Sequence, residues 1–234
     1  GYRRATNRER VRFALMWANH DLATAPPHRG AMPREEFERM VQHITARYCS
    51  QPTYWRVNGA LYFSIYQPAT FIEGLGGTAA AREALDAWRA RLRAGGLGEL
   101  HLNLVDYQLV KGDARALVRA LGADSVTSYT WVHEPAVFQT MAASFPAAPY
   151  AQARRAYFES WDRRWADFEV PHFPNVTLGW DSTPRVPPGQ TLARGPYPHS
   201  PVLVGNTPGA VREAVREAAR RALRHPVGRR IVTV

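Results

Sequence analysis

Short, continuous apolar runs recur along this 234-residue chain, separated by longer stretches in which apolar residues follow helical spacing. A strand that is buried on both faces of a parallel sheet is apolar along its whole length, whereas a half-exposed strand alternates. The runs therefore predict six buried strands, at residues 11–17, 60–66, 100–105, 125–132, 176–178 and 229–234.

Between these runs, five stretches carry apolar residues at every third or fourth position, which is typical of a helix with one face in the core. We expect helices at residues 33–48, 78–94, 113–121, 150–168 and 207–224. Thr78 and Asp113 can cap two of the starts, Thr207-Pro208 can begin the last helix, and Gly95-Gly96 can end the second one. Strands that alternate with helices indicate an α/β fold with a parallel sheet.

The connections between these elements are uneven in length. Most helix-to-strand links are short, whereas the strand-to-helix links at residues 20–32, 67–77, 133–149 and 181–206 are long. In a (β/α)8 TIM-type barrel the loops after the strands carry the function, and a doubly wound sheet also binds ligands at that end. The chain has no dinucleotide-binding fingerprint, and aromatic residues recur at the strand ends. We therefore favour an incomplete (β/α)8 barrel of six strands and five or six helices, forming one domain over residues 1–234.

The strongest candidate chemistry follows the run at residues 176–178, where Gly179 leads into a Pro- and Gly-rich loop that carries Trp180, Asp181 and Arg185. An indole ring can cover the apolar face of a sugar, and the two charged groups can hydrogen-bond its hydroxyls. This segment therefore predicts sugar recognition. The alternative is a buried tryptophan beside an Asp–Arg pair that only caps the loop.

Similar residues stand at the ends of other predicted strands. We predict a substrate-binding set made of Trp17, Asn19, His20, Tyr66, Tyr129, Trp131, Trp180, Asp181 and Arg185. Alternatives stay open for several members: Asn19 and His20 can instead cap their loop, and the tyrosines and Trp131 can fill the barrel interior.

Acidic residues also occur at strand ends, as Asp21, Asp106, Glu134 and Asp181. Hydrolysis of a glycosidic bond uses two carboxyl groups on either side of that bond. None of the four forms an obvious pair with another in sequence, so we predict no catalytic pair within the chain.

Composition excludes several other functions. The net charge is +10, but most arginines alternate with glutamates on predicted helices, and no nucleic-acid motif is present. The eight histidines show no metal-binding spacing, and no apolar run approaches the ~20 residues of a membrane span. With a single cysteine, Cys49, the chain can form no internal disulfide. We therefore expect a glycan partner and no metal, cofactor, nucleic acid or membrane insertion.

Four segments in one order resemble a known family. They are Phe13-Ala-Leu-Met-Trp-Ala-Asn-His20, Tyr54-Trp-Arg-Val-Asn-Gly-Ala-Leu-Tyr-Phe-Ser-Ile-Tyr66, Gly179-Trp-Asp-Ser-Thr-Pro-Arg185 and Ile231-Val-Thr-Val234. The chain is similar to glycoside hydrolase family 99-like, or WbsX-like, polysaccharide proteins over nearly its whole length. This resemblance implies a (β/α)8 barrel of which the chain covers strands three to eight.

The resemblance also implies function. Better-studied relatives are endo-acting α-mannosidases that retain anomeric configuration, and WbsX-like members accompany bacterial polysaccharide and lipopolysaccharide biosynthesis, often described as glycosyltransferases. The family's two catalytic glutamates follow the eighth strand, so we expect them beyond Val234 and expect the chain alone to be inactive. The first interpretation is a glycoside hydrolase that cuts a bacterial-type polysaccharide. The alternatives are a glycosyltransferase and a non-catalytic glycan-binding module.

Overall fold

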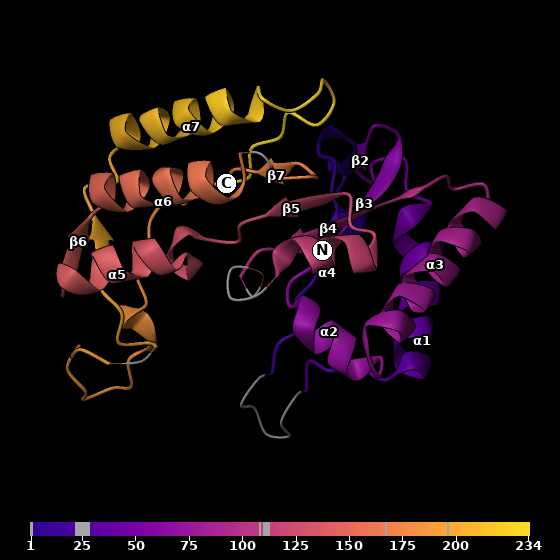
Figure 1. The fold of residues 1–234 in the computed structure, drawn as a ribbon, viewed down its shortest axis with the longest axis horizontal. Coiled ribbons are helices and arrows are strands. Elements are labelled where there is room, and N and C mark those ends of the chain that lie inside the picture. Colours follow the sequence, from indigo (N-terminus) through magenta and orange to yellow (C-terminus); the bar gives the residue numbers. More distant parts are fainter. Residues whose placement is uncertain (1, 22–28, 108, 110–112, 167, 196) are drawn as a thin grey trace. The chain divides into compact units, whose positions relative to one another are not determined.

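A computed structural model describes residues 2–21, 29–107, 109, 113–166, 168–195 and 197–234 of the chain (Figure 1). The chain forms two compact units, residues 1–126 and 127–234. Helices and strands alternate through both units, so the predicted α/β class is confirmed. The strands of the described residues form an open, mostly parallel sheet and a separate strand pair, with no closed barrel among them.

The first unit is built on a parallel sheet. Its strands β1 (Leu15–Trp17), β3 (Ala60–Ile65), β4 (Leu100–Val105) and β5 (Ser125–Thr127) lie side by side in the order β1-β3-β4-β5. A short strand, β2 (Arg56–Val57), pairs antiparallel with β3. Because β1, β3 and β4 are parallel, their carboxyl ends meet at one edge of the sheet.

One face of this sheet is covered by helices α1 (Arg34–Ile44), α2 (Pro68–Gly74) and α3 (Thr78–Ala94), which Figure 1 shows grouped in the first unit. Phe63 of β3 meets Trp88 of α3 edge-on, with ring centroids 4.9 Å apart. Trp88, Leu85 and Leu92 form the buried stripe of α3, as the helical spacing predicts. Helix α1 continues into a π-helical turn at Thr45–Cys49, and α4 (Ala114–Leu121) starts where Asp113 accepts a hydrogen bond from the backbone N–H of Ala116.

The opposite face of the sheet carries buried polar side chains. Ser64 donates to Asn103 Oδ1 at 2.8 Å, and Asn103 Nδ2 donates to Ser125 Oγ at 2.8 Å, so one row of hydrogen bonds crosses β3, β4 and β5. His101 Nε2 lies 2.8 Å from the same Ser125 oxygen. The ring of Tyr62 stacks on His101, and burial raises the pKa of the Tyr62 phenol. The row therefore satisfies groups that would otherwise be costly to bury.

The second unit is helical around a small aromatic core. Helix α6 (Tyr150–Arg164) lies between α5 (Pro135–Ala143) and α7 (Pro208–Ala222) (Figure 1). Trp131, in the 3-10 turn Trp131–His133, has no exposed surface and contacts Tyr150, Tyr157 and Phe158. The strands are β6 (Ala147–Pro149) and β8 (Val202–Val204), which pair in parallel, and β7 (His172–Phe173). Further 3-10 turns lie at Tyr2–Arg4 and Arg8–Arg10 in the first unit and at Thr183–Arg185 in the second.

Several predicted boundaries were wrong. The strand expected at residues 176–178 lies earlier, as β7, and residues 229–234 contain only an isolated bridge from Thr233 to Asn175. The runs at residues 11–17 and 125–132 contain shorter strands, and the long connections at residues 67–77 and 133–149 contain α2 and α5. Both of these helices begin with a proline, which fits the first helical position.

Candidate functional site

Asn19 joins the carboxyl ends of β1 and β3 through its side chain. Its Nδ2 donates to the carbonyl of Gln67 at 2.7 Å, and its Oδ1 accepts from the N–H of Gln67 at 2.8 Å. The regular main-chain pairing of β1 ends at Trp17. Two residues later, the side-chain amide of Asn19 makes the same donor and acceptor pair that a strand's main chain would make. Asn19 is fully buried, so it positions its neighbours and offers no surface of its own.

The residues beside Asn19 form what we call the strand-end cluster: His20, Tyr66, Asp106 and Tyr107. The His20 ring meets Tyr66 edge-on at 5.5 Å, and Tyr66 lies nearly parallel to Tyr107, with centroids 6.0 Å apart and planes 14° apart. These residues follow β1, β3 and β4, so the parallel sheet brings them to the same edge. Both tyrosine rings are only half-buried, whereas Asp106 is 5% exposed.

His20 has one feature that packing does not explain. Its Nδ1 is buried and has no hydrogen-bond partner among the residues that the structure describes. A buried polar atom without a partner is uncommon, because it has given up its hydrogen bonds to water. The cluster thus offers two aromatic faces and a ring nitrogen that can still make a hydrogen bond.

A second aromatic pair lies in the long loop of the second unit. Trp180 Nε1 donates to Ser200 Oγ at 2.8 Å, and Ser200 Oγ lies 2.7 Å from Ser182 Oγ, so the half-buried indole is held in place. Tyr197, which is 59% exposed, lies 6.4 Å from Trp180. We call Trp180 and Tyr197 the loop aromatic pair.

Asp181 and Arg185 do not form an ion pair with each other in the described part of the loop. Asp181 Oδ1 instead accepts from the Thr183 hydroxyl at 2.7 Å and from the Thr183 N–H at 2.9 Å. These two hydrogen bonds lower the pKa of the Asp181 carboxyl. Both Asp181 and Arg185 are exposed, so they remain accessible to a ligand while Asp181 also shapes the turn.

The remaining residues of the predicted set have other surroundings. Trp17 lies 5.9 Å from both Phe37 and Phe71 on the helix side of the sheet. Trp131 is fully buried and donates through Nε1 to the carbonyl of Asn175. Tyr129 is 52% exposed and stacks on His133. The predicted set is therefore divided among core positions, the strand-end cluster and exposed positions of the second unit.

Sequence reasoning left Tyr107 and Tyr197 out of the predicted set. Tyr107 stands two residues after β4, as Tyr66 stands one residue after β3, so the rule that selected Tyr66 also selects Tyr107. Tyr197 lies far from any strand end in sequence, and only its contact with Trp180 reveals it.

No group of three or more His, Cys, Asp and Glu side chains among the described residues is arranged to hold a metal ion. No described helix is both long enough and apolar enough to span a membrane.

The fold and the strand-end cluster define an α/β protein whose polar and aromatic groups gather at the carboxyl ends of parallel strands. The chain belongs to the family described as "Glycosyltransferase WbsX", whose family model matches residues 3–234. That description names the family as a carbohydrate-active one.

One solved structure, described as "Glycoside hydrolase-like protein", has a similar fold. It superposes with a TM-score of 0.51 at 13% sequence identity and covers 85% of this chain. The chain spans about half of that protein's length, because the match covers 49% of it. No curated protein matches the chain.

Proposed function

We propose that the strand-end cluster binds a glycan, and that the protein is a glycoside hydrolase acting within a bacterial-type polysaccharide chain. The observation that carries the proposal is the buried, unpaired His20 Nδ1 beside the stacked rings of Tyr66 and Tyr107. The half-buried rings can cover the apolar face of a sugar, and the imidazole nitrogen can hydrogen-bond a hydroxyl. The described likeness to a hydrolase-like structure supports this proposal through the fold alone.

The other predicted contacts enter the proposal according to their exposure. Trp180, Asp181, Arg185 and Tyr129 keep accessible surface in the second unit and remain proposed sugar contacts. Asn19 is a positioning residue, since it fixes the main chain next to His20. Trp131 is fully buried, and the half-buried Trp17 packs against Phe37 and Phe71 on the helix side of the sheet, so we do not propose direct sugar contacts for either.

Binding tests the role of the cluster. We expect Tyr66→Ala to weaken binding of yeast α-mannan, or of a Gram-negative O-polysaccharide, about tenfold, which corresponds to about 1.4 kcal/mol. Isothermal titration of the complete gene product would measure it. Phe138→Ala is the matched control, because Phe138 is an aromatic residue on α5 that is 48% exposed and lies outside both aromatic groups. Equal affinities for the Tyr66 variant and the unmodified protein would refute the site.

A glycosyltransferase is the second candidate, and the description of the family favours it. The two activities differ in their products. A hydrolase releases new reducing ends from polysaccharide alone, whereas a transferase adds sugar only when an activated sugar donor is present. Incubating the complete gene product with polysaccharide, with and without nucleotide sugars, therefore distinguishes them. Binding without either product would leave a non-catalytic glycan-binding module.

A further inference from the structure

The second unit contains a buried carboxylate whose hydrogen-bonding capacity is not satisfied by the described residues around it. Glu134 is 6% exposed, and its Oε1 has no hydrogen-bond partner among the described residues. The cation of its ion pair is Arg164, whose Nη2 lies 3.7 Å from Oε1, which is too far for a hydrogen bond. An ionised carboxylate with an unsatisfied buried oxygen destabilises a fold, so such a group calls for another explanation.

The position of Glu134 does not supply a structural role for its side chain. The residue links the 3-10 turn Trp131–His133 to α5, and its main chain is already paired, through its N–H to Trp131 and its carbonyl to Phe138. The carboxylate caps neither element. Asp113 and Asp181 differ in this respect, since each accepts hydrogen bonds from the turn that follows it.

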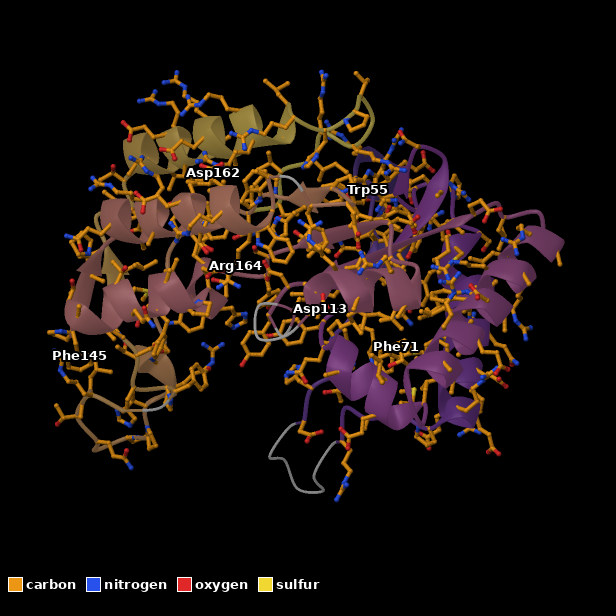
Figure 2. All side chains as sticks on the ribbon, viewed as in Figure 1. Trp55, Phe71, Asp113, Phe145, Asp162 and Arg164 are labelled. Carbon is orange, nitrogen blue, oxygen red and sulfur yellow. The ribbon has the colours of Figure 1, made fainter. Side chains whose placement is uncertain are left out.

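Groups suited to a sugar stand near this carboxylate: Tyr129 and His133 shortly before it in the chain, and Arg164 beside it in space. The rings of Tyr129 and His133 stack in parallel at 5.8 Å, and Tyr129 is 52% exposed. Arg164 is the last residue of α6, and 39% of its side-chain surface is exposed. Figure 2 shows Arg164 on the side of α6 that faces α5, whereas Asp162 is turned toward α7. The Arg164 side chain therefore lies beside the buried carboxylate and is itself partly exposed to solvent.

We propose that Glu134, Arg164 and the Tyr129–His133 stack form a sugar subsite in the second unit. Glu134 accepts a hydrogen bond from a sugar hydroxyl, which replaces the distant Arg164 and supplies the donor that Oε1 lacks. The exposed ring of Tyr129 covers an apolar face of the sugar. Arg164 is the group that moves to admit the hydroxyl, because it is long, partly exposed and not hydrogen-bonded to Oε1. This inference rests on the proposed glycan-binding function.

A single substitution separates a ligand-binding role from a structural one. Glu134→Gln keeps the size of the side chain but removes its charge, so an ion pair that holds the fold would be lost and the unfolding midpoint would fall. A carboxylate kept for a ligand gives the opposite pattern: the midpoint stays the same or rises, and affinity for yeast α-mannan falls at least tenfold. Glu159→Gln is the matched control, since Glu159 is an exposed glutamate on α6.

Both quantities are measured on the complete gene product, by isothermal titration and by urea unfolding, beside Tyr66→Ala. Unchanged affinity in Glu134→Gln, with weakened binding in Tyr66→Ala, overturns the subsite and leaves the proposed function standing. A lowered unfolding midpoint with unchanged affinity assigns Glu134 to the fold and overturns the subsite too. Absence of binding by the unmodified protein to any polysaccharide tested overturns both proposals.

Discussion

Asn19 shows how one side chain can do the work of a strand residue. Its amide pairs with both polar main-chain groups of Gln67, and this happens at a position without exposed surface. The two hydrogen bonds hold the ends of β1 and β3 together at the edge where His20 and Tyr66 lie. A positioning residue of this kind affects stability first and ligand binding only through the neighbours that it fixes.

We expect Asn19→Ala to lower the free energy of unfolding by about 1–3 kcal/mol, because it leaves the N–H and carbonyl of Gln67 without their partners. Asn19→Asp should be at least as harmful, since it sets a carboxylate oxygen against the Gln67 carbonyl. Urea unfolding would measure both. Asn7→Ala is the control, because Asn7 is exposed and makes no capping hydrogen bond. If Asn19→Ala were as stable as that control, the strand-like role would be excluded.

The positions of helices and strands were predictable where one face of the element is buried, and less predictable at the ends where the chain turns. The stripe of α3, the Asp113 cap and the start of α7 at Thr207-Pro208 follow from local spacing and side-chain chemistry, and all three are observed. The cap expected at Thr78 was wrong, because Thr78 is the first residue of α3 and Gly77 stands at the capping position without a side chain. The strand at residues 176–178 was wrong because an apolar run records burial but not main-chain pairing. Residues 176 and 177 are indeed buried, yet they lie beyond β7 without a regular strand partner.

The candidate site was predictable to a similar extent. Parallel strands predict that residues after them meet at one edge, which places His20 near Tyr66. The same rule cannot distinguish the two faces of a strand end, so Trp17, which packs on the helix side of the sheet, was selected together with Tyr66. It also cannot distinguish buried from exposed positions, so the fully buried Trp131 was selected too. The loop aromatic pair depends on tertiary contacts between residues 17 positions apart, and local sequence carries no signal for them.

The hydrogen bond between His225, just after α7, and His172 of β7 predicts that stability depends on pH. His225, just after α7, donates through Nε2 to the carbonyl of His172, and burial lowers the pKa of His225. Below its ordinary value of about 6.5, the unfolded chain takes up a proton that the folded protein resists. The stabilising contribution is therefore complete above about pH 6.5 and is lost as the pH falls toward the folded-state pKa.

Urea unfolding at pH 7.5 and 5.5 would measure this difference in stability. We expect His225→Gln to show a smaller loss between the two pH values than the unmodified protein, because glutamine keeps an N–H donor but does not titrate. His199→Gln serves as the control, since His199 shows no comparable contact with His172 and lies in the loop of the second unit. An identical pH dependence in the His225 variant would contradict the assignment.

At the scale of the whole molecule, the family model covers nearly the entire chain, while the number of cooperative units stays a prediction. The sequence predicts one domain over residues 1–234, and the structure contains two compact units that meet between Val126 and Thr127 in the chain. This boundary falls within β5, whose three residues are all buried. A linker between independent domains is ordinarily exposed.

A single domain predicts one calorimetric transition. At about 0.7 kcal/mol per residue near 60 °C, a 234-residue cooperative unit has an unfolding enthalpy of about 160 kcal/mol. Independent units would instead give two transitions, of about 90 and 75 kcal/mol. Differential scanning calorimetry distinguishes the two results, and the calorimetric and van't Hoff enthalpies should agree if the protein unfolds as one unit. Two separable transitions would replace the single-domain prediction.

The two ends of the segment between β1 and α1 are fixed to each other, which bears on how the chain tolerates insertions. Gly30 donates its N–H to Asp21 Oδ1 at 2.8 Å, and a Cβ at Gly30 would stand 2.4 Å from the carbonyl oxygen of Asn19. The hydrogen bond thus holds Asp21 and Gly30 together next to His20, and this contact does not depend on the number of residues between them. Lengthening a loop whose ends are already fixed costs little free energy. Insertions between Asp21 and Gly30 are therefore expected to cost little stability while the Asp21–Gly30 hydrogen bond stays in place.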